Sequence, residues 1–200
     1  MGKGEETRQA ILEQAIALAS EVGVSGLSIG ALADKAGMSK SGLFAHFGSK
    51  EEMQLAVLRA AQERFAEFAF KPALKERRGL PRLRALMTNW LNWTEKARLP
   101  GACPLNSAAN EFDDQPGPVR DAVAAGLADG RRMLANAVRL AVEAGDLRED
   151  TDVDQFVFEL VGIELAAMQS QRLFRDKQAI PRALGAFERL VRDHQPSRKE

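Results

Sequence analysis

Short polar and basic side chains stand together at Ser39-Lys40-Ser41, directly before apolar residues at helical spacing. Ser39 is placed to cap a helix with its hydroxyl, and Gly42 would let the backbone of that helix approach a partner closely. Such a helix start suits the major groove of DNA, where N-terminal residues read base edges while hydroxyls, amines and backbone amides hold phosphates. The chemistry predicted for this segment is hydrogen bonding to DNA.

Two short helices must position these groups. The first has one inward apolar stripe, formed by Ile29, Leu32, Ala33 and Ala36. Ser28 can cap this helix, and Gly37 falls at its end, where glycine tolerates the left-handed backbone that a helix terminus often needs. The second helix follows Ser39, with Leu43 and Phe47 on its inward side and Phe44 near its edge. The spacing therefore predicts a helix-turn-helix.

A third helix start follows at Ser49-Lys50-Glu51-Glu52, which has the pattern of a capping box. Lys50 lies at the positive end of the helix dipole, where free amides already favour an anion, and we expect it to hold a phosphate. The alternative for Lys50 is an ordinary solvated lysine. His46 is expected to donate a ring N–H to a phosphate, and its alternative is a solvated or packed ring.

The segment from Thr7 to Met53 resembles the N-terminal DNA-binding domain of TetR/AcrR-family transcriptional regulators. The resemblance begins with an amphipathic stripe that ends at Gly23 and continues through both short helices to the third helix start. The matching residues are Ile11, Leu12, Ala15, Leu18, Ala19 and Gly23, then Ser28-Ile29, Leu32-Ala33, Ala36-Gly37, Ser39-Lys40-Ser41, His46-Phe47 and Ser49-Lys50-Glu51.

The resemblance implies an all-α fold with two domains. Residues 1–50 would form a three-helix helix-turn-helix DNA-binding domain, and residues 51–200 a larger helical ligand-binding and dimerisation domain. Together with the spacing, it places the DNA contacts at Ser28, Ser39, Lys40, Ser41, Gly42, Phe44, Ala45, His46 and Lys50. The family usually carries a tyrosine where this chain has Phe44. Because Phe44 lacks the hydroxyl, a phosphate contact worth about 1 kcal/mol is lost, and we expect Phe44 to act mainly in packing.

Composition and charge narrow the class of protein. The chain has 200 residues, 45% of them hydrophobic, and equal numbers of basic and acidic residues. Residues 1–50 are also neutral overall, so the distribution of charge matters for DNA binding, and we expect Lys3, Lys40, His46 and Lys50 to share one face with the acids elsewhere. The single Cys103 excludes an intrachain disulfide, and neither an export segment nor a membrane-spanning run is apparent. We expect a cytoplasmic protein that contacts no membrane and needs no cofactor or metal.

From Glu52 onward the chain reads as helical, with turns predicted near Gly79, Pro100, Gly117, Gly145 and Ile180-Pro181. A long helix is predicted from about Val119 to Ala144, and it contains Gly126 and Gly130. Glycine costs helix stability, so the pair indicates close helix packing or, as the alternative, room for a cavity.

Two segments near the C-terminus, Phe156–Met168 and Ile180–Val191, carry apolar residues around more of a helix than one core face requires. Pairing both with the same helices of a second chain would bury the excess, which predicts a homodimer with a four-helix interface. Two recognition helices related by a two-fold axis would enter successive major grooves about 34–36 Å apart. The expected operator is therefore an imperfect palindrome.

The central helices would house a small-molecule effector, as the resemblance implies. Large or adaptable apolar side chains suited to its pocket are Phe65, Met87, Trp90, Trp93, Phe112, Met133 and Met168. Taken singly, each of them fits an ordinary core or surface position better. The sequence does not name the effector.

Two other functions stay open. A helical enzyme could use Cys103 with His46 or His194 as nucleophile and base, but His46 lies in the predicted DNA-reading segment and His194 in a predicted frayed tail. No phosphate loop or metal-spaced cluster appears, so no catalytic or metal-ligating residue is predicted. Cys103 is expected to be a buried structural cysteine, with a redox sensor as its alternative. The second function is a DNA-binding adaptor that responds to no ligand.

These patterns favour a DNA-binding transcriptional regulator. We expect a repressor that binds a palindromic operator in double-stranded DNA as a homodimer and is released by an unknown small molecule. Release requires that molecule to bind the DNA-incompetent state more tightly, because equal affinity for both states shifts nothing.

Overall fold

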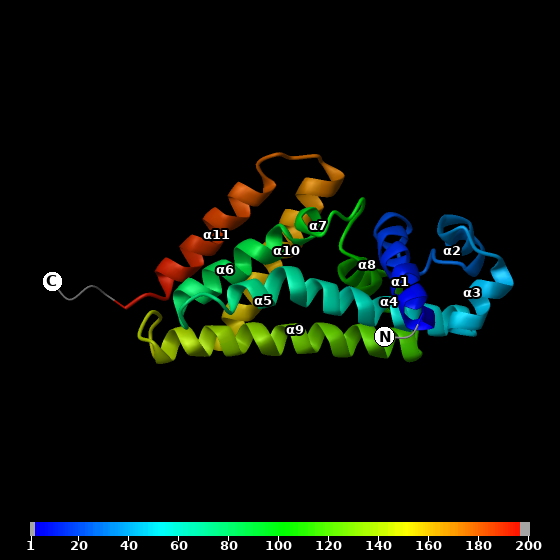
Figure 1. The fold of residues 1–200 in the computed structure, drawn as a ribbon. Coiled ribbons are helices and arrows are strands. Elements are labelled where there is room, and N and C mark those ends of the chain that lie inside the picture. The colour runs from blue at the N-terminus through cyan, green and yellow to red at the C-terminus, as the bar shows by residue number, and fades with distance from the viewer. Residues whose placement is uncertain (1–2, 197–200) are drawn as a thin grey trace. The chain divides into compact units, whose positions relative to one another are not determined.

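The computed structural model describes residues 3–196, and every regular element in that range is helical. The elements in chain order are α1 (Lys3–Val22), α2 (Ile29–Ala36), α3 (Lys40–Phe47), α4 (Lys50–Phe65), the π-helix η1 (Ala66–Phe70), α5 (Lys71–Ala73), α6 (Leu80–Leu91), α7 (Trp93–Lys96), α8 (Pro104–Phe112), α9 (Pro118–Glu143), α10 (Val153–Leu173) and α11 (Ala179–Asp193) (Figure 1). The predicted all-α fold is confirmed. Within residues 3–196, no helix is both long and apolar enough to cross a membrane.

The described chain divides into two compact units. The first unit holds the residues up to Phe65 together with Thr94–Leu127, and the second holds Ala66–Trp93 together with the residues from Ala128 onward. This division differs from the predicted boundary at residue 50, because α4 and α8 both pack on α1 within the first unit. Helices α1–α3, which we call the head, are thus part of a larger unit made from two separate stretches of sequence.

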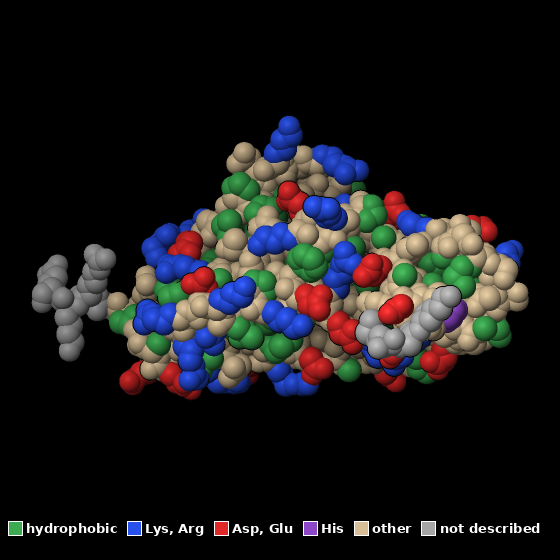
Figure 2. Space-filling view, in the orientation of Figure 1, with side chains coloured by type: hydrophobic (Ala, Val, Ile, Leu, Met, Phe, Trp, Pro, Cys, Tyr) green, Lys and Arg blue, Asp and Glu red, His purple; other side chains and the backbone are tan. Residues whose placement is uncertain are grey.

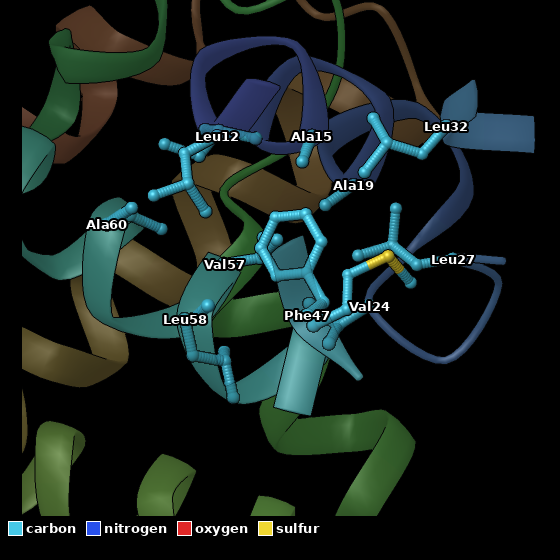
Figure 3. Packing of buried hydrophobic residues seen from close by; sticks show 14 of the residues in the cluster. Leu12, Ala15, Ala19, Val24, Leu27, Leu32, Phe47, Val57, Leu58 and Ala60 are labelled. Atoms are coloured by element: carbon cyan, nitrogen blue, oxygen red, sulfur yellow. The ribbon is translucent and has the colours of Figure 1, made fainter. Parts of the chain in front are cut away.

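The core of the first unit joins the head to α4. Figure 3 shows Leu12, Ala15 and Ala19 of α1 converging with Phe47 of α3 and Val57 of α4. Beyond the head and α4, the same cluster includes Ala108, Phe112, Val119 and Val123. Each large apolar side chain buried in this way stabilises the fold by about 1.5–3 kcal/mol. A shared core of this kind is what holds helices as short as α2 and α3.

The segment before α8 is tied to the end of α1 by its backbone. The N–H of Ala102 donates to the carbonyl oxygen of Ser20 over 2.7 Å, and the N–H of Gly101 donates to the Ser20 hydroxyl over 3.0 Å. A Cβ on residue 101 would lie 1.7 Å from the Ser20 carbonyl oxygen. Only glycine allows this approach, because the neighbouring atom belongs to the backbone and cannot rotate away.

The long predicted helix is observed as α9, and its two glycines differ in their surroundings. A Cβ on Gly126 would lie 1.8 Å from the side-chain nitrogen of Gln62, so this glycine makes room for a side chain of α4. A Cβ on Gly130 would meet nothing within 4 Å. The packing interpretation therefore holds for Gly126 and not for Gly130.

The second unit is built around α10 and α11, which pack against each other and against α6 (Figure 1). Arg84 of α6 donates two hydrogen bonds of 2.8 Å to the carboxylate of Glu188 in α11. These hydrogen bonds lower the pKa of Glu188 and raise the pKa of Arg84, so the pair stays ionised near neutral pH. Because the two side chains are 44% and 39% exposed, solvent screening limits the pair to about 0.5 kcal/mol.

The turn between α10 and α11 corrects one expectation. The sequence predicts a break at Ile180-Pro181, but the structure places it at residues 174–178. Pro181 instead lies in the first turn of α11, where its missing N–H costs little. The break contains Arg175 in left-handed backbone, with φ 55°, so it has no glycine to mark it in the sequence.

The two glycine environments give a matched pair of substitutions. Gly101→Ala should destabilise the protein by about 2 kcal/mol or more, because the added methyl group overlaps backbone that must move. Gly130→Ala should stabilise it by about 1 kcal/mol, because alanine is the better helix former and the space is open. Urea unfolding of the three proteins measures both effects. Equal stability of the two variants would show that the Gly101 approach is not held in solution.

Candidate nucleic-acid interface

The first helix of the predicted helix-turn-helix is α2, and both of its ends are capped. The N–H of Ala31 donates to the Ser28 hydroxyl over 3.1 Å. At the other end Gly37 is left-handed, with φ 63°, and Met38 donates its N–H to the carbonyl oxygen of Ala33 over 3.0 Å. Both capping predictions for this helix are confirmed, and they set where the chain turns into α3.

The second helix, α3, exposes the side chains predicted to face DNA. Ser39 caps it by accepting a hydrogen bond of 3.1 Å from the N–H of Gly42. Leu43 and Phe47 are buried, as predicted. The side chains that the structure leaves exposed on this helix are Lys40, Ser41, Phe44 and Ala45. The Ser39 and Ser41 hydroxyls lie 3.2 Å apart, which gathers two hydroxyls at the helix start.

Phe44 differs from its predicted role. We expected the ring to serve mainly in packing, but it is 52% exposed. Helical geometry explains the difference, because Leu43 and Phe47 already occupy the inward side and the position after Leu43 turns away from it. An exposed aromatic ring is therefore available on the same helix as the predicted base-reading residues.

Lys40 extends across the start of α2. A Cβ on Gly30 would lie 3.4 Å from Cε and 3.7 Å from Nζ of Lys40. The absence of a side chain at residue 30 thus leaves space for the lysine stem. The ammonium group is brought close to a second helix N-terminus, where backbone amides favour anions. This contribution of Gly30 is not evident in the sequence, since it depends on how α2 and α3 cross.

Lys50 begins α4 with its ammonium group 2.7 Å from the carbonyl oxygen of Ser25, to which it donates. The N–H of Glu52 donates to the Ser49 hydroxyl over 3.0 Å, which provides one of the two hydrogen bonds of the predicted capping box. Lys50 is exposed, and a lysine ammonium has three donors, so one hydrogen bond leaves capacity for a phosphate. The structure thus fixes the side chain at a helix N-terminus without covering it.

Arg8 of α1 is a further candidate that the sequence reasoning did not select. Its guanidinium carbon lies 5.5 Å from the centroid of the Phe47 ring, a cation–π arrangement at the end of α3. His46, in the last turn of the same helix, is half-buried. In the sequence, Arg8 is recognisable only as a basic residue one turn before Ile11-Leu12. The fold adds that this turn of α1 contacts the end of α3.

Basic and acidic groups are mixed on the face of the molecule drawn in Figure 2. Lys35 of α2 forms a salt bridge of 3.0 Å with Glu21 of α1, so one basic side chain of the head is already paired with an acid. On the face drawn in Figure 2, basic and acidic side chains alternate, with no continuous basic patch among the residues described. This face therefore offers placed single cations, not a basic patch, for attraction to DNA. The side chain of Lys3, which is expected to share a face with Lys40, His46 and Lys50, lies outside the described residues.

The side chains suggested for an effector pocket fall into three groups by burial. Met87, Trp93 and Phe112 are buried core residues. Phe65, Trp90 and Met168 are half-buried, and Met133 is 44% exposed. Of two grooves found in the second unit, one runs between α10 and α11 and the other between α9 and α10, and neither includes any of these residues. The effector pocket stays a prediction.

Two residues considered for catalysis, Cys103 and His194, are packed or hydrogen-bonded within the fold. Cys103 is buried at the start of α8. His194, expected in a frayed tail, instead ends α11, with its Nδ1 2.9 Å from the carbonyl oxygen of Leu190 and its ring edge-on to Phe156 at 5.1 Å. Its own carbonyl oxygen accepts a hydrogen bond of 2.8 Å from Arg148. The long-range contacts, which the sequence does not show, order this end of the helix.

Comparison with protein families gave two matches. Residues 11–57 match the model for bacterial regulatory proteins of the tetR family. Residues 79–187 match the model for the tetracyclin repressor-like C-terminal domain, which covers more than half of the chain. A search of curated proteins found no significant match.

Solved structures share the fold over nearly the whole chain. A TetR-family transcriptional regulator from Cytophaga hutchinsonii is 17% identical, with a TM-score of 0.86 over 99% of both chains. A TetR regulator from Chloroflexus aurantiacus is 25% identical, with a TM-score of 0.84 over 97% of this chain and 98% of the other. AibR, solved in complex with isovaleryl coenzyme A and operator DNA, is 22% identical, with a TM-score of 0.69 over 90% and 96%.

The first family match spans the capped helix-turn-helix, and the second spans the later helices from the start of α6 into α11, which belong to both compact units. The similar solved structures share the fold over nearly the full length of this chain. The chain belongs to the TetR family of bacterial regulatory proteins, whose members are DNA-binding transcriptional regulators and not enzymes.

Proposed function

We propose that this regulator is a cytoplasmic repressor that binds a palindromic operator as a homodimer and leaves it when a small-molecule effector binds. The observation that carries the DNA-binding part is the construction of α3. Its N-terminus is fixed by the Ser39 cap, its inward side is buried, and Lys40 and Ser41 are exposed at the end that would enter the groove. Such a helix can read base edges without losing order.

Different residues serve different parts of DNA recognition in this proposal. Ser41 lies in the first turn of α3 and contacts a base edge. Lys50, at the start of α4 and held on the Ser25 carbonyl, contacts a phosphate. Phosphate contacts add affinity for any sequence and depend on salt, whereas base contacts set preference.

Selection of genomic fragments by the purified protein, followed by binding titrations, tests the proposal. Lys50→Ala should weaken binding to all duplexes alike and reduce the salt dependence by about two counterions in a dimer, one for each subunit. Ser41→Ala should instead change the preference at one base position in each half-site. Lys75→Ala removes an exposed lysine of the second unit and serves as the control. If the wild-type protein prefers no duplex at low salt, the proposed function is wrong.

The dimer is proposed to form through α10 and α11. A groove of about 740 Å³ runs between these helices, and small residues such as Gly162, Ala166 and Ala183 line it. Phe158 of α10 lines this groove and is 70% exposed, and Leu165, two turns further along the same helix, is 48% exposed. Large exposed apolar side chains next to a groove of small ones can interdigitate with a second copy across a two-fold axis.

One substitution on this surface should separate the subunits. Phe158→Arg places a charge where the proposed interface excludes water, so it should convert the dimer to a monomer. Leu74→Arg is the matched control, because Leu74 is also an exposed apolar residue, at 59%, but lies outside both helices. Sedimentation equilibrium gives the mass of each variant. A monomeric wild-type protein, or a dimeric Phe158→Arg variant, would exclude this interface.

The effector is proposed by analogy with relatives. AibR binds both isovaleryl coenzyme A and operator DNA. In this chain, the half-buried side chains of Trp90 and Met168 in the second unit are the candidates for a pocket that opens to admit a ligand. The adaptor alternative has no such pocket and predicts no response to any metabolite.

A thermal-shift screen separates the effector from the adaptor function. A compound present at about 100 times its Kd should raise the free energy of unfolding by about 2.7 kcal/mol. Isovaleryl coenzyme A and other acyl thioesters form the first panel, with free coenzyme A as the control. A stabilising compound that leaves operator affinity unchanged is a ligand but not an inducer. Absence of any response across a broad metabolite panel favours the adaptor.

A further inference from the structure

The loop between α1 and α2 is held at Ser25 from both sides. The N–H of Ser25 donates to Oε2 of Glu111 over 2.7 Å, and the carbonyl oxygen of Ser25 accepts from Nζ of Lys50 over 2.7 Å. Glu111 lies in α8, 86 positions along the chain from Ser25, and all three residues belong to the first unit. A carboxylate and an ammonium group therefore meet the same short piece of backbone.

The first residue of the loop, Gly23, makes room for the Glu111 carboxylate. Gly23 has φ +78°, and a Cβ there would lie 2.2 Å from Oε1 of Glu111. Glycine thus gives the backbone conformation and the space that the carboxylate occupies. The segment leading into α8 is also fixed, because Gly101 and Ala102 bind the backbone and hydroxyl of Ser20 at the end of α1.

The rest of the loop is held by α4. The side-chain nitrogen of Gln54 donates to the carbonyl oxygen of Val24 over 2.9 Å, and Gln54 is buried. Val24 and Leu27 on either side of Ser25 are fully buried. The Ser25 carbonyl is therefore part of a rigid segment, in which Glu111 supplies the contact that comes from outside the head and α4.

We propose that Glu111 is a positioning residue for DNA binding, which acts through Ser25 to place the ammonium group of Lys50 against a phosphate. This inference rests on the proposed function. Lysine has a long side chain with many rotamers, and ordering it on binding costs entropy. A fixed carbonyl at 2.7 Å holds Nζ before DNA arrives and leaves two donors for the phosphate. Loss of Glu111 leaves the N–H of Ser25 without this hydrogen bond, so the Ser25 carbonyl that holds Lys50 is less firmly placed.

The sign of the effect separates positioning from simple electrostatics. Glu111 is an acid in the DNA-binding unit, so its removal would by charge alone reduce repulsion and tighten DNA binding. Removal of a positioning residue instead weakens binding. The two explanations therefore predict opposite results for the same substitution.

A double-mutant cycle tests the proposal with the full-length protein. The probe is a long duplex of mixed sequence at low salt, which reports phosphate contacts without requiring a known operator. Glu111→Ala should weaken binding about fivefold, the size of one ordinary hydrogen bond, because Glu111 does not itself contact DNA and only part of its contact with Ser25 is felt in binding. In the Lys50→Ala background the same substitution should have no effect, since the group that it positions is absent. Glu111→Gln keeps an acceptor oxygen and should bind within about twofold of wild type.

Two further variants complete the test. Asp114→Ala removes an exposed acid three positions away and should not weaken binding. Glu111→Asp keeps the charge but withdraws the acceptor by one methylene, so it should behave like Glu111→Ala, and it replaces that variant if thermal unfolding shows Glu111→Ala to be misfolded. Equal losses with and without Lys50, unchanged or tighter binding, or failure of Glu111→Gln to restore affinity would overturn the positioning role alone. Absence of DNA binding by the wild-type protein would overturn the proposed function with it.

Discussion

Helices of eight residues do not hold together in water by themselves, and this constraint underlies the structure of the head. Nucleating a helix costs more than a few backbone hydrogen bonds return, so α2 and α3 depend on burial. Leu32 and Leu43 are fully buried, and Phe47 reaches the side chains of α1 and α4. The serine caps fix where the helices begin, but it is the shared core that keeps them helical. The exposed side of α3 is available for recognition because the opposite side, with Leu43 and Phe47, is buried in the core.

The same constraint explains why the compact unit is larger than a three-helix head. A core that includes Met53, Val57 and Ala61 of α4 leaves no clean boundary at residue 50. Ala108 and Phe112 then cover the outer part of that core from α8. Polar contacts reinforce this apolar packing. The backbone at Gly101 approaches Ser20 closely, and the Glu111 carboxylate accepts a hydrogen bond from the N–H of Ser25. The DNA-reading helices thus share their stability with a segment that is remote in sequence.

Local rules predicted the parts of the site that depend on neighbouring residues. The caps at Ser28 and Ser39 and the left-handed Gly37 follow from side-chain chemistry within a few positions, and all three are observed. The exposure of Phe44 is set by helical geometry and not by its missing hydroxyl, because Leu43 and Phe47 already fill the inward side of α3. The contact of Glu111 with Ser25 could not be predicted, since it joins residues 86 positions apart and depends on how α8 packs. The order at His194 was missed for the same reason, as its partners are contributed by α10 and by the segment before it.

The discontinuous first unit limits how this regulator can be recombined with others. A chimera joined at residue 50, or at the end of α4, would keep the recognition helix but separate it from Thr94–Leu127. The transplanted piece would then expose the apolar side chains that α8 covers, and the backbone of Ser20 would face a foreign loop. A functional exchange of DNA specificity must therefore either transfer both stretches together or change only the exposed residues of α3 within the resident framework.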